Sequence, residues 1–114
     1  MTKLSVLMLP EYTGEYEVAR HKFVLKVLTH EEMGAVRKGS EDKQAAVGFS
    51  TFQYRLELLA RAIKSIDESD VDGSIEERKK DLNGVEVGIL AKLSECYSEL
   101  AEKYEKDIGL VPNS

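Results

Sequence analysis

The sequence contains little of what disulfide, metal or membrane proteins rely on: one cysteine, two histidines and no tryptophan in 114 residues. A single cysteine, Cys96, cannot form an internal disulfide. No stretch approaches the roughly 18 apolar residues that a membrane-spanning helix needs. The net charge is −5 and the basic residues do not cluster, which argues against nucleic acid as a partner. These absences predict a protein that binds neither a membrane nor nucleic acid.

Residue patterns for metal or cofactor chemistry are missing too. His21 and His30 lie nine residues apart with no cysteine near them, a spacing that matches no zinc motif. Residues 68–73 resemble the start of a calcium loop, but Lys79 occupies the position that must be a bidentate acid. Cys96 falls in the apolar stripe of an expected helix, where cysteine acts as a small hydrophobe. We therefore expect no metal, no cofactor and no catalytic group, and a protein that is not an enzyme.

The composition is that of a globular protein, with 42% apolar and 32% charged residues. The length allows one domain, residues 1–114. We predict an α+β fold in which a β segment of two or three strands, residues 1–28, packs on a bundle of two long and two short α-helices, residues 29–109. Residues 110–114 are expected to form a tail.

The N-terminal part of the chain favours strands. Residues 4–9, LSVLML, form an apolar run that ends at Pro10, too soon for a signal peptide. Both faces of this run are apolar, so as an edge strand it would need to be covered by helices, by a partner or by a second copy. From Tyr16 to Leu28 the residues alternate loosely, with apolar side chains on one face.

Two short helices are predicted from their start signals. Thr29 and Glu32 have the spacing of a capping box, and the helix that they begin should end at Gly39. Ser74 and Glu77 form a second capping box, which should begin the other short helix.

Two longer helices are predicted from apolar stripes. The first should begin at Ser40, and its stripe has residues spaced by three and four: Phe49, Phe52, Leu56, Leu59, Ile63 and Ile66. Glu57 and Arg61, at i and i+4, should pair on the exposed side of this helix. The last helix should run from about Val85 to Ile108.

Tyrosines at the edge of the core and uncovered apolar residues are the remaining candidates for contacts with a partner, because such side chains are favoured at protein interfaces. The candidate protein-binding residues are Leu4, Val6, Met8, Tyr12, Tyr16, Tyr54 and Tyr97. The alternative is that the tyrosines only cover the edges of the core.

The order of these features resembles that of small phage tail assembly chaperones and related tail or baseplate proteins. The resemblance rests on VLTHEE (residues 27–32) leading into a helix, ELLARAIKSID (residues 57–67), the acidic turn DVDG (residues 70–73) and the helix start EER (residues 76–78). It extends over residues 16–105, most of the chain.

The resemblance implies a non-enzymatic protein of the host cytoplasm. Such a protein binds the tape-measure protein, shields its apolar helical segments and helps tail-tube subunits to polymerise. The unusually apolar N-terminus leaves open a permanent structural role in the tail or baseplate of the virion, and a small cytosolic regulatory protein is a third reading. The expected partner is the tape-measure or tail-tube protein, and a homo-oligomer is left open.

Overall fold

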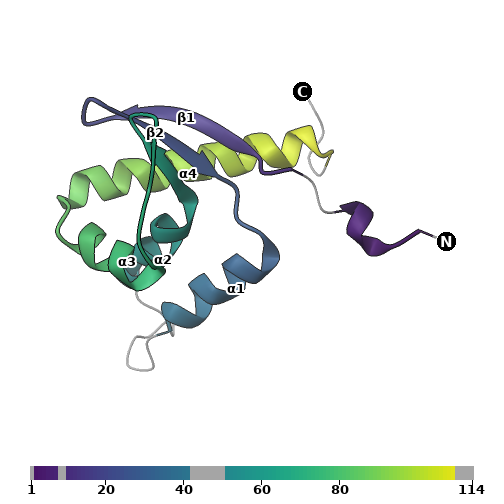
Figure 1. Cartoon of the computed structure of the whole chain (residues 1–114), viewed down its shortest axis with the longest axis horizontal. Helices are drawn as coiled ribbons and strands as arrows, with labels where there is room; N and C mark the ends of the chain where they lie inside the picture. The colour runs from purple at the N-terminus through teal and green to yellow at the C-terminus, as the bar shows by residue number, and fades with distance from the viewer. Residues whose placement is uncertain (1, 8–9, 42–50, 110–114) are drawn as a thin grey trace.

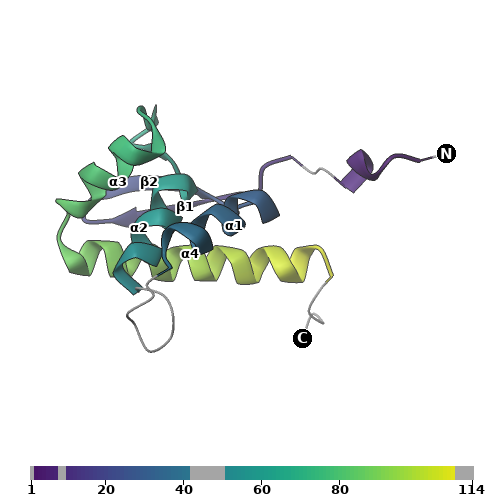
Figure 2. The same ribbon diagram turned by 90° about the horizontal axis from the view of Figure 1, so that it is seen from below.

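The computed structural model describes residues 2–7, 10–41 and 51–109. A four-stranded antiparallel sheet packs against helices on one of its faces, which confirms the predicted α+β class. Figures 1 and 2 show the longest helix running along the sheet, with the other helices beside it.

The strands are β1 (Thr13–Val18), β2 (His21–Lys26), β3 (Ile63–Ile66) and β4 (Ser69–Asp70), and they are ordered β1-β2-β3-β4 across the sheet. Residues 1–28 therefore supply two strands, within the predicted two or three. The other two strands come from a hairpin within the segment that was predicted to be helical.

The helices are α1 (His30–Gly39), α2 (Thr51–Ala62), α3 (Ile75–Asn83) and α4 (Val87–Asp107). Thr29 and Glu32 form the predicted capping box at the start of α1. At the start of α3, the Ser74 side chain accepts a hydrogen bond from the Glu77 backbone N–H, as predicted. Among the described residues α4 is the longest helix, with 21 residues, whereas α2 has 12.

The predicted helix through Ile63 and Ile66 is wrong at its C-terminal end, because both residues lie in β3. Ile66 pairs with Phe23 of β2, and Asp67 and Glu68 form the tight turn to β4 with φ values of 50° and 71°. A stripe spaced by three and four does not distinguish a helix that continues from one that gives way to a strand. Phe52 is 69% exposed rather than in the core. Ser40, the predicted start of this helix, is the C-cap of α1, and residues 42–50 lie outside the described residues.

The prediction of a strand at residues 4–9 is also wrong where the structure describes it. Residues Leu4–Leu7 form a single turn of 3-10 helix, η1, with Leu4 83% and Leu7 72% exposed. Figures 1 and 2 show this N-terminal arm (residues 2–7) standing away from the body, beyond the start of β1. A short strand forms only when a neighbouring strand pairs with its backbone, and within the described residues none does.

The core lies between the inner face of the sheet and the helices. Its largest fully buried apolar side chains are Leu25, Leu59, Leu93, Leu100 and Val36. Cys96 is buried among them, as predicted, and burial raises the pKa of its thiol. The outer face of the sheet instead carries charged pairs, such as Lys64 Nζ and Glu11 Oε1 at 2.8 Å.

Glu57 is a buried charge within this core, not the exposed residue that was predicted. Its side chain is 3% exposed and its Oε1 lies 2.8 Å from Lys79 Nζ, which joins α2 to α3. The predicted pair with Arg61 is present, with 3.5 Å between Arg61 Nη1 and Glu57 Oε2. The hydrogen bond to Glu57 raises the pKa of Lys79. The negative charge of Glu57 is thus compensated by the positive charges of Lys79 and Arg61.

Candidate functional site

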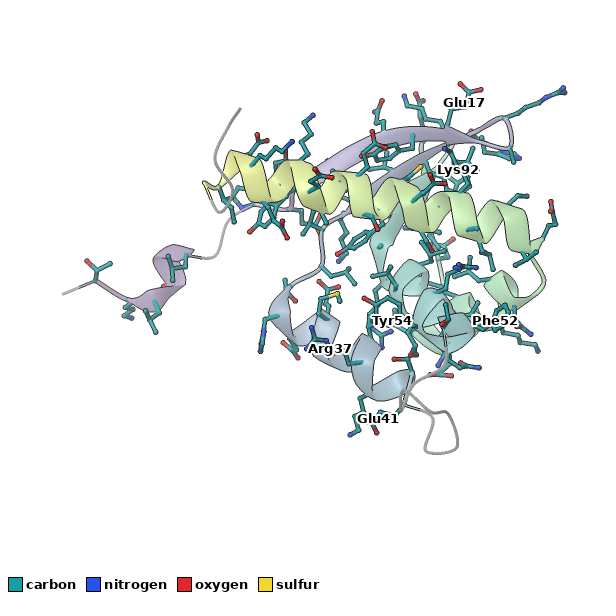
Figure 3. All side chains as sticks on the ribbon, turned by 180° about the vertical axis from the view of Figure 1, so that it is seen from behind. Glu17, Arg37, Glu41, Phe52, Tyr54 and Lys92 are labelled. Atoms are coloured by element: carbon teal, nitrogen blue, oxygen red, sulfur yellow. The ribbon has the colours of Figure 1, made fainter. Side chains whose placement is uncertain are left out.

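A groove of about 370 Å³ runs between α2 and α4. It is lined by Thr51, Tyr54, Arg55, Leu58, Ser94, Tyr97, Ser98, Ala101, Glu102 and Glu105. We call it the α2–α4 groove. Figure 3 labels Tyr54 and Phe52 on the two sides of α2, with Tyr54 toward α1 and Phe52 away from it.

The α4 wall of the groove is made of small side chains. Ser94, Ser98 and Ala101 are spaced by four and three residues, so they follow one another along a single face of the helix. The Ser94 hydroxyl oxygen is buried and has no hydrogen-bond partner among the residues that the structure describes. Small residues leave room for another backbone to approach α4 closely, and the buried side chain of Leu58 gives the groove an apolar floor.

The two rims of the α2–α4 groove carry opposite charges. Arg55 lies on the α2 rim, while Glu102 and Glu105 lie on the α4 rim. Glu102 is partly compensated by Lys106, at 3.7 Å. A segment bound between the rims would therefore place an acidic side chain toward α2 and a basic one toward α4.

The structure separates the predicted tyrosines into different roles. Tyr54 is half-buried and lines the α2–α4 groove. Tyr97 is only 8% exposed, and its hydroxyl oxygen accepts a hydrogen bond from the Leu28 backbone N–H at 3.2 Å. Tyr97 is therefore a core residue whose ring reaches only the bottom of the groove, which agrees with the alternative that tyrosines cover the core edge.

Tyr16 lies on β1 and Tyr12 lies on the segment before it, and both are away from the α2–α4 groove. The Tyr12 hydroxyl donates a hydrogen bond to the Asp107 carboxylate, and its ring meets the ring of Tyr104 edge-on at 5.2 Å. These contacts tie the end of α4 to the sheet. Tyr16 is half-buried and lines a second groove, between β1 and α4.

Leu4 is the N-terminal candidate whose side chain the structure describes. Leu4 is exposed on the arm. Met8 and the side chain of Val6 lie outside the described residues. The sequence prediction missed Arg55, Ser94 and Ser98 as groove residues. For Ser94 and Ser98 the one signal in the sequence was the run of small residues that borders the apolar stripe of α4, and Arg55 had none.

The contact between Tyr12 and Asp107 predicts a change in stability at alkaline pH. The hydrogen bond to the carboxylate raises the pKa of Tyr12 from 10 to about 12. The fold favours the protonated hydroxyl, so this contribution is complete below pH 10 and is lost as the pH rises through about 12. The difference in tyrosinate absorbance between wild type and Tyr12→Phe should show a midpoint near 12. A midpoint near the ordinary tyrosine value would contradict the contact.

Neither a metal-binding cluster nor a membrane-spanning helix is found in the described part of the chain. Within it, no cluster of three or more His, Cys, Asp or Glu side chains is arranged to hold a metal ion. The helices described are too short or too polar to span a membrane. His21 Nδ1 lies 2.6 Å from Asp67 Oδ2, so this histidine is part of the contact between the two hairpins.

Comparison of the chain with protein families, with characterised proteins and with solved structures finds no match.

Proposed function

We propose that this chain is a non-enzymatic protein-binding module and that the α2–α4 groove holds an apolar helical segment of its partner. The biological role that we propose is that of a phage tail assembly chaperone, with the tape-measure protein as partner. The observation that carries the binding role is the combination, in one groove, of an apolar floor, a wall of small residues and oppositely charged rims.

A helix is the occupant that this geometry supports best. The groove lies between two helices, and a third helix can pack its side chains between those of α2 and α4. Ser94, Ser98 and Ala101 would let the partner helix approach α4 closely. The rim charges then favour one orientation, in which the partner's basic side chain faces Glu102 or Glu105 and its acidic side chain faces Arg55.

The proposed chaperone role follows from the resemblance together with this groove. A tape-measure protein is a long amphipathic helix that aggregates until tube subunits cover it, so it needs a temporary cover of moderate affinity. The alternative is a permanent structural role in the tail or baseplate. The exposed leucines of the N-terminal arm favour that alternative, because a structural component requires a permanent contact surface.

The experiment is co-expression of the full chain with a tape-measure fragment from the same tail gene cluster. Wild type should keep the fragment soluble in a stable complex. Ser98→Trp should fill the groove and weaken binding at least about tenfold. Glu95→Trp adds the same bulk to an exposed position of α4 that does not line the groove, so it should bind like wild type.

Circular dichroism of both variants checks that each is folded. A fragment that is equally soluble without this chain would contradict the chaperone role. Equal binding by Ser98→Trp and Glu95→Trp would contradict the α2–α4 groove as the site.

A further inference from the structure

Strand β1 has an edge with which no described strand pairs. Its other edge pairs with β2 through a two-residue turn at Ala19 and Arg20, and the Val27 N–H donates to the Tyr12 carbonyl at 2.9 Å. Hydrogen-bonded pairs alternate in an antiparallel ladder, so even-numbered residues of β1 bond to β2. The N–H and C=O groups of Thr13, Glu15 and Glu17 therefore point toward the open edge.

A groove of about 460 Å³ runs along this edge on the inner side of the sheet, between β1 and α4. Its β1 side is formed by Gly14, Glu15 and Tyr16. Its α4 side is formed by Leu100, which is 1% exposed, and by the charged residues Glu99, Glu102, Lys103 and Lys106. At Gly14 the groove depends on the missing side chain, because a Cβ there would lie 2.8 Å from Leu100 Cδ1. An added strand would thus find backbone partners along the edge, and its inward side chains would lie against the Tyr16 ring and the hydrocarbon stems of Lys103 and Lys106.

The outer side of the edge decides what kind of strand can be added. Glu15 and Glu17 are both exposed there, so a second β1 placed against this edge with glutamates opposite glutamates would be repelled. A strand with a basic residue on its outer face would match the glutamates, and aliphatic residues on its inner face would face the groove between β1 and α4.

Residues 3–7 of the N-terminal arm have that pattern except at Leu7, which falls on the outer face with Lys3 and Ser5. In the sequence KLSVL, residues 3–7, Leu4 and Val6 alternate with Lys3 and Ser5. The arm is held in a single 3-10 turn, with Leu4 and Leu7 exposed. Figures 1 and 2 show that it extends beyond the start of β1, away from its own open edge. A second copy lying antiparallel to the first would place its β1 beside this arm.

We propose that residues 3–7 of one copy add as an antiparallel strand to the β1 edge of a second copy, and that the second copy returns the same contact. Lys3 then lies opposite Glu17, Leu4 opposite Tyr16 and Val6 opposite Gly14. In this register Lys3 and Ser5 bond to the open backbone groups of Glu17 and Glu15, and Leu4 and Val6 face the groove between β1 and α4.

Such a dimer is isologous, so each stabilising pair occurs twice. It places the apolar arm in a covered strand, as the alternating pattern of residues 3–7 favours, and it closes both open edges. This contact goes beyond the proposed function, because it does not use the α2–α4 groove.

Sedimentation of the full chain over a range of concentrations tests the dimer. Wild type should associate to twice the monomer mass. Ser5→Pro removes the N–H that pairs with Glu15 and should weaken dimerisation about tenfold or more, since the loss occurs twice. Proline is tolerated in the first turn of a helix, so the arm of the monomer should be unaffected. Thr2→Pro, outside the paired residues, is the matched control and should dimerise like wild type.

Charge exchange gives a second test. Lys3→Glu and Glu17→Lys should each weaken the dimer about tenfold, and the two substitutions combined should restore it. Three results would overturn the proposal: a wild type that remains monomeric, a dimer equally stable in Ser5→Pro and Thr2→Pro, or a double variant no better than the singles. A fourth result would also overturn the proposal: a monomer in which the Glu15 amide is protected from hydrogen exchange in the wild type but not in Ser5→Pro. That result would show that the arm pairs with the β1 edge of its own chain.

Discussion

Glu57→Ala should destabilise the protein by about 3–5 kcal/mol, because it leaves cations without their buried partner. The carboxylate is 3% exposed and lies 2.8 Å from Lys79 Nζ and 3.5 Å from Arg61 Nη1. Removing it breaks the contact between α2 and α3 and leaves a cavity in the core. Urea unfolding followed by circular dichroism measures this loss, and the melting temperature should fall by roughly 10–20 °C.

Glu76→Ala is the matched control for this prediction. Glu76 also pairs with Lys79, at 3.1 Å, but its side chain is 83% exposed. An exposed pair of this kind contributes about 0–1 kcal/mol. If the two variants unfold at the same urea concentration, Glu57 does not anchor the helices as the structure indicates.

Gly39→Ala should destabilise the protein by about 1–3 kcal/mol, although alanine is normally better than glycine in a helix. A Cβ at Gly39 would lie 2.1 Å from Glu57 Oε2. The end of a glutamate side chain usually moves aside easily. Here its movement would pull the carboxylate, which is 3% exposed, away from Lys79 Nζ at 2.8 Å.

Gly34→Ala gives the opposite expected sign in the same helix. A Cβ at Gly34 meets nothing within 4 Å, so alanine there should stabilise α1 by about 0.5–1 kcal/mol. In a Glu57→Ala background the cost of Gly39→Ala should largely disappear, since the clashing group is gone. If Gly39→Ala stabilises the otherwise wild-type protein, as Gly34→Ala is expected to do, Glu57 is not packed against the end of α1.

The sequence by itself determined the elements whose signals are local. The capping residues Thr29 and Ser74 hydrogen-bond to backbone groups three residues later, so their partners are fixed by spacing alone. The apolar stripe of α4 predicted both that helix and the burial of Cys96, because one side of a long helix must face the core. The α+β class followed from the change of period along the chain.

The tertiary structure alone decided the features that depend on distant partners. Ile63 and Ile66 form a strand because β2, about forty residues earlier, pairs with them. Their turn, Asp67–Glu68, adopts positive φ values without the Asn-Gly or Asp-Gly signature that marks such hairpins in a sequence.

Dependence on distant partners also explains the α2–α4 groove and the burial of Glu57. From the sequence alone, Glu57 is predicted to form an exposed ion pair within its own helix. In the structure it is buried, because α3 packs against α2 and places Lys79 beside it. The α2–α4 groove exists only where the two helices meet, so the sequence of either helix alone does not predict it. Local hydrogen bonds and periodicity are set by neighbours within one or two turns, whereas burial and strand pairing are set by whichever distant segment the fold places alongside.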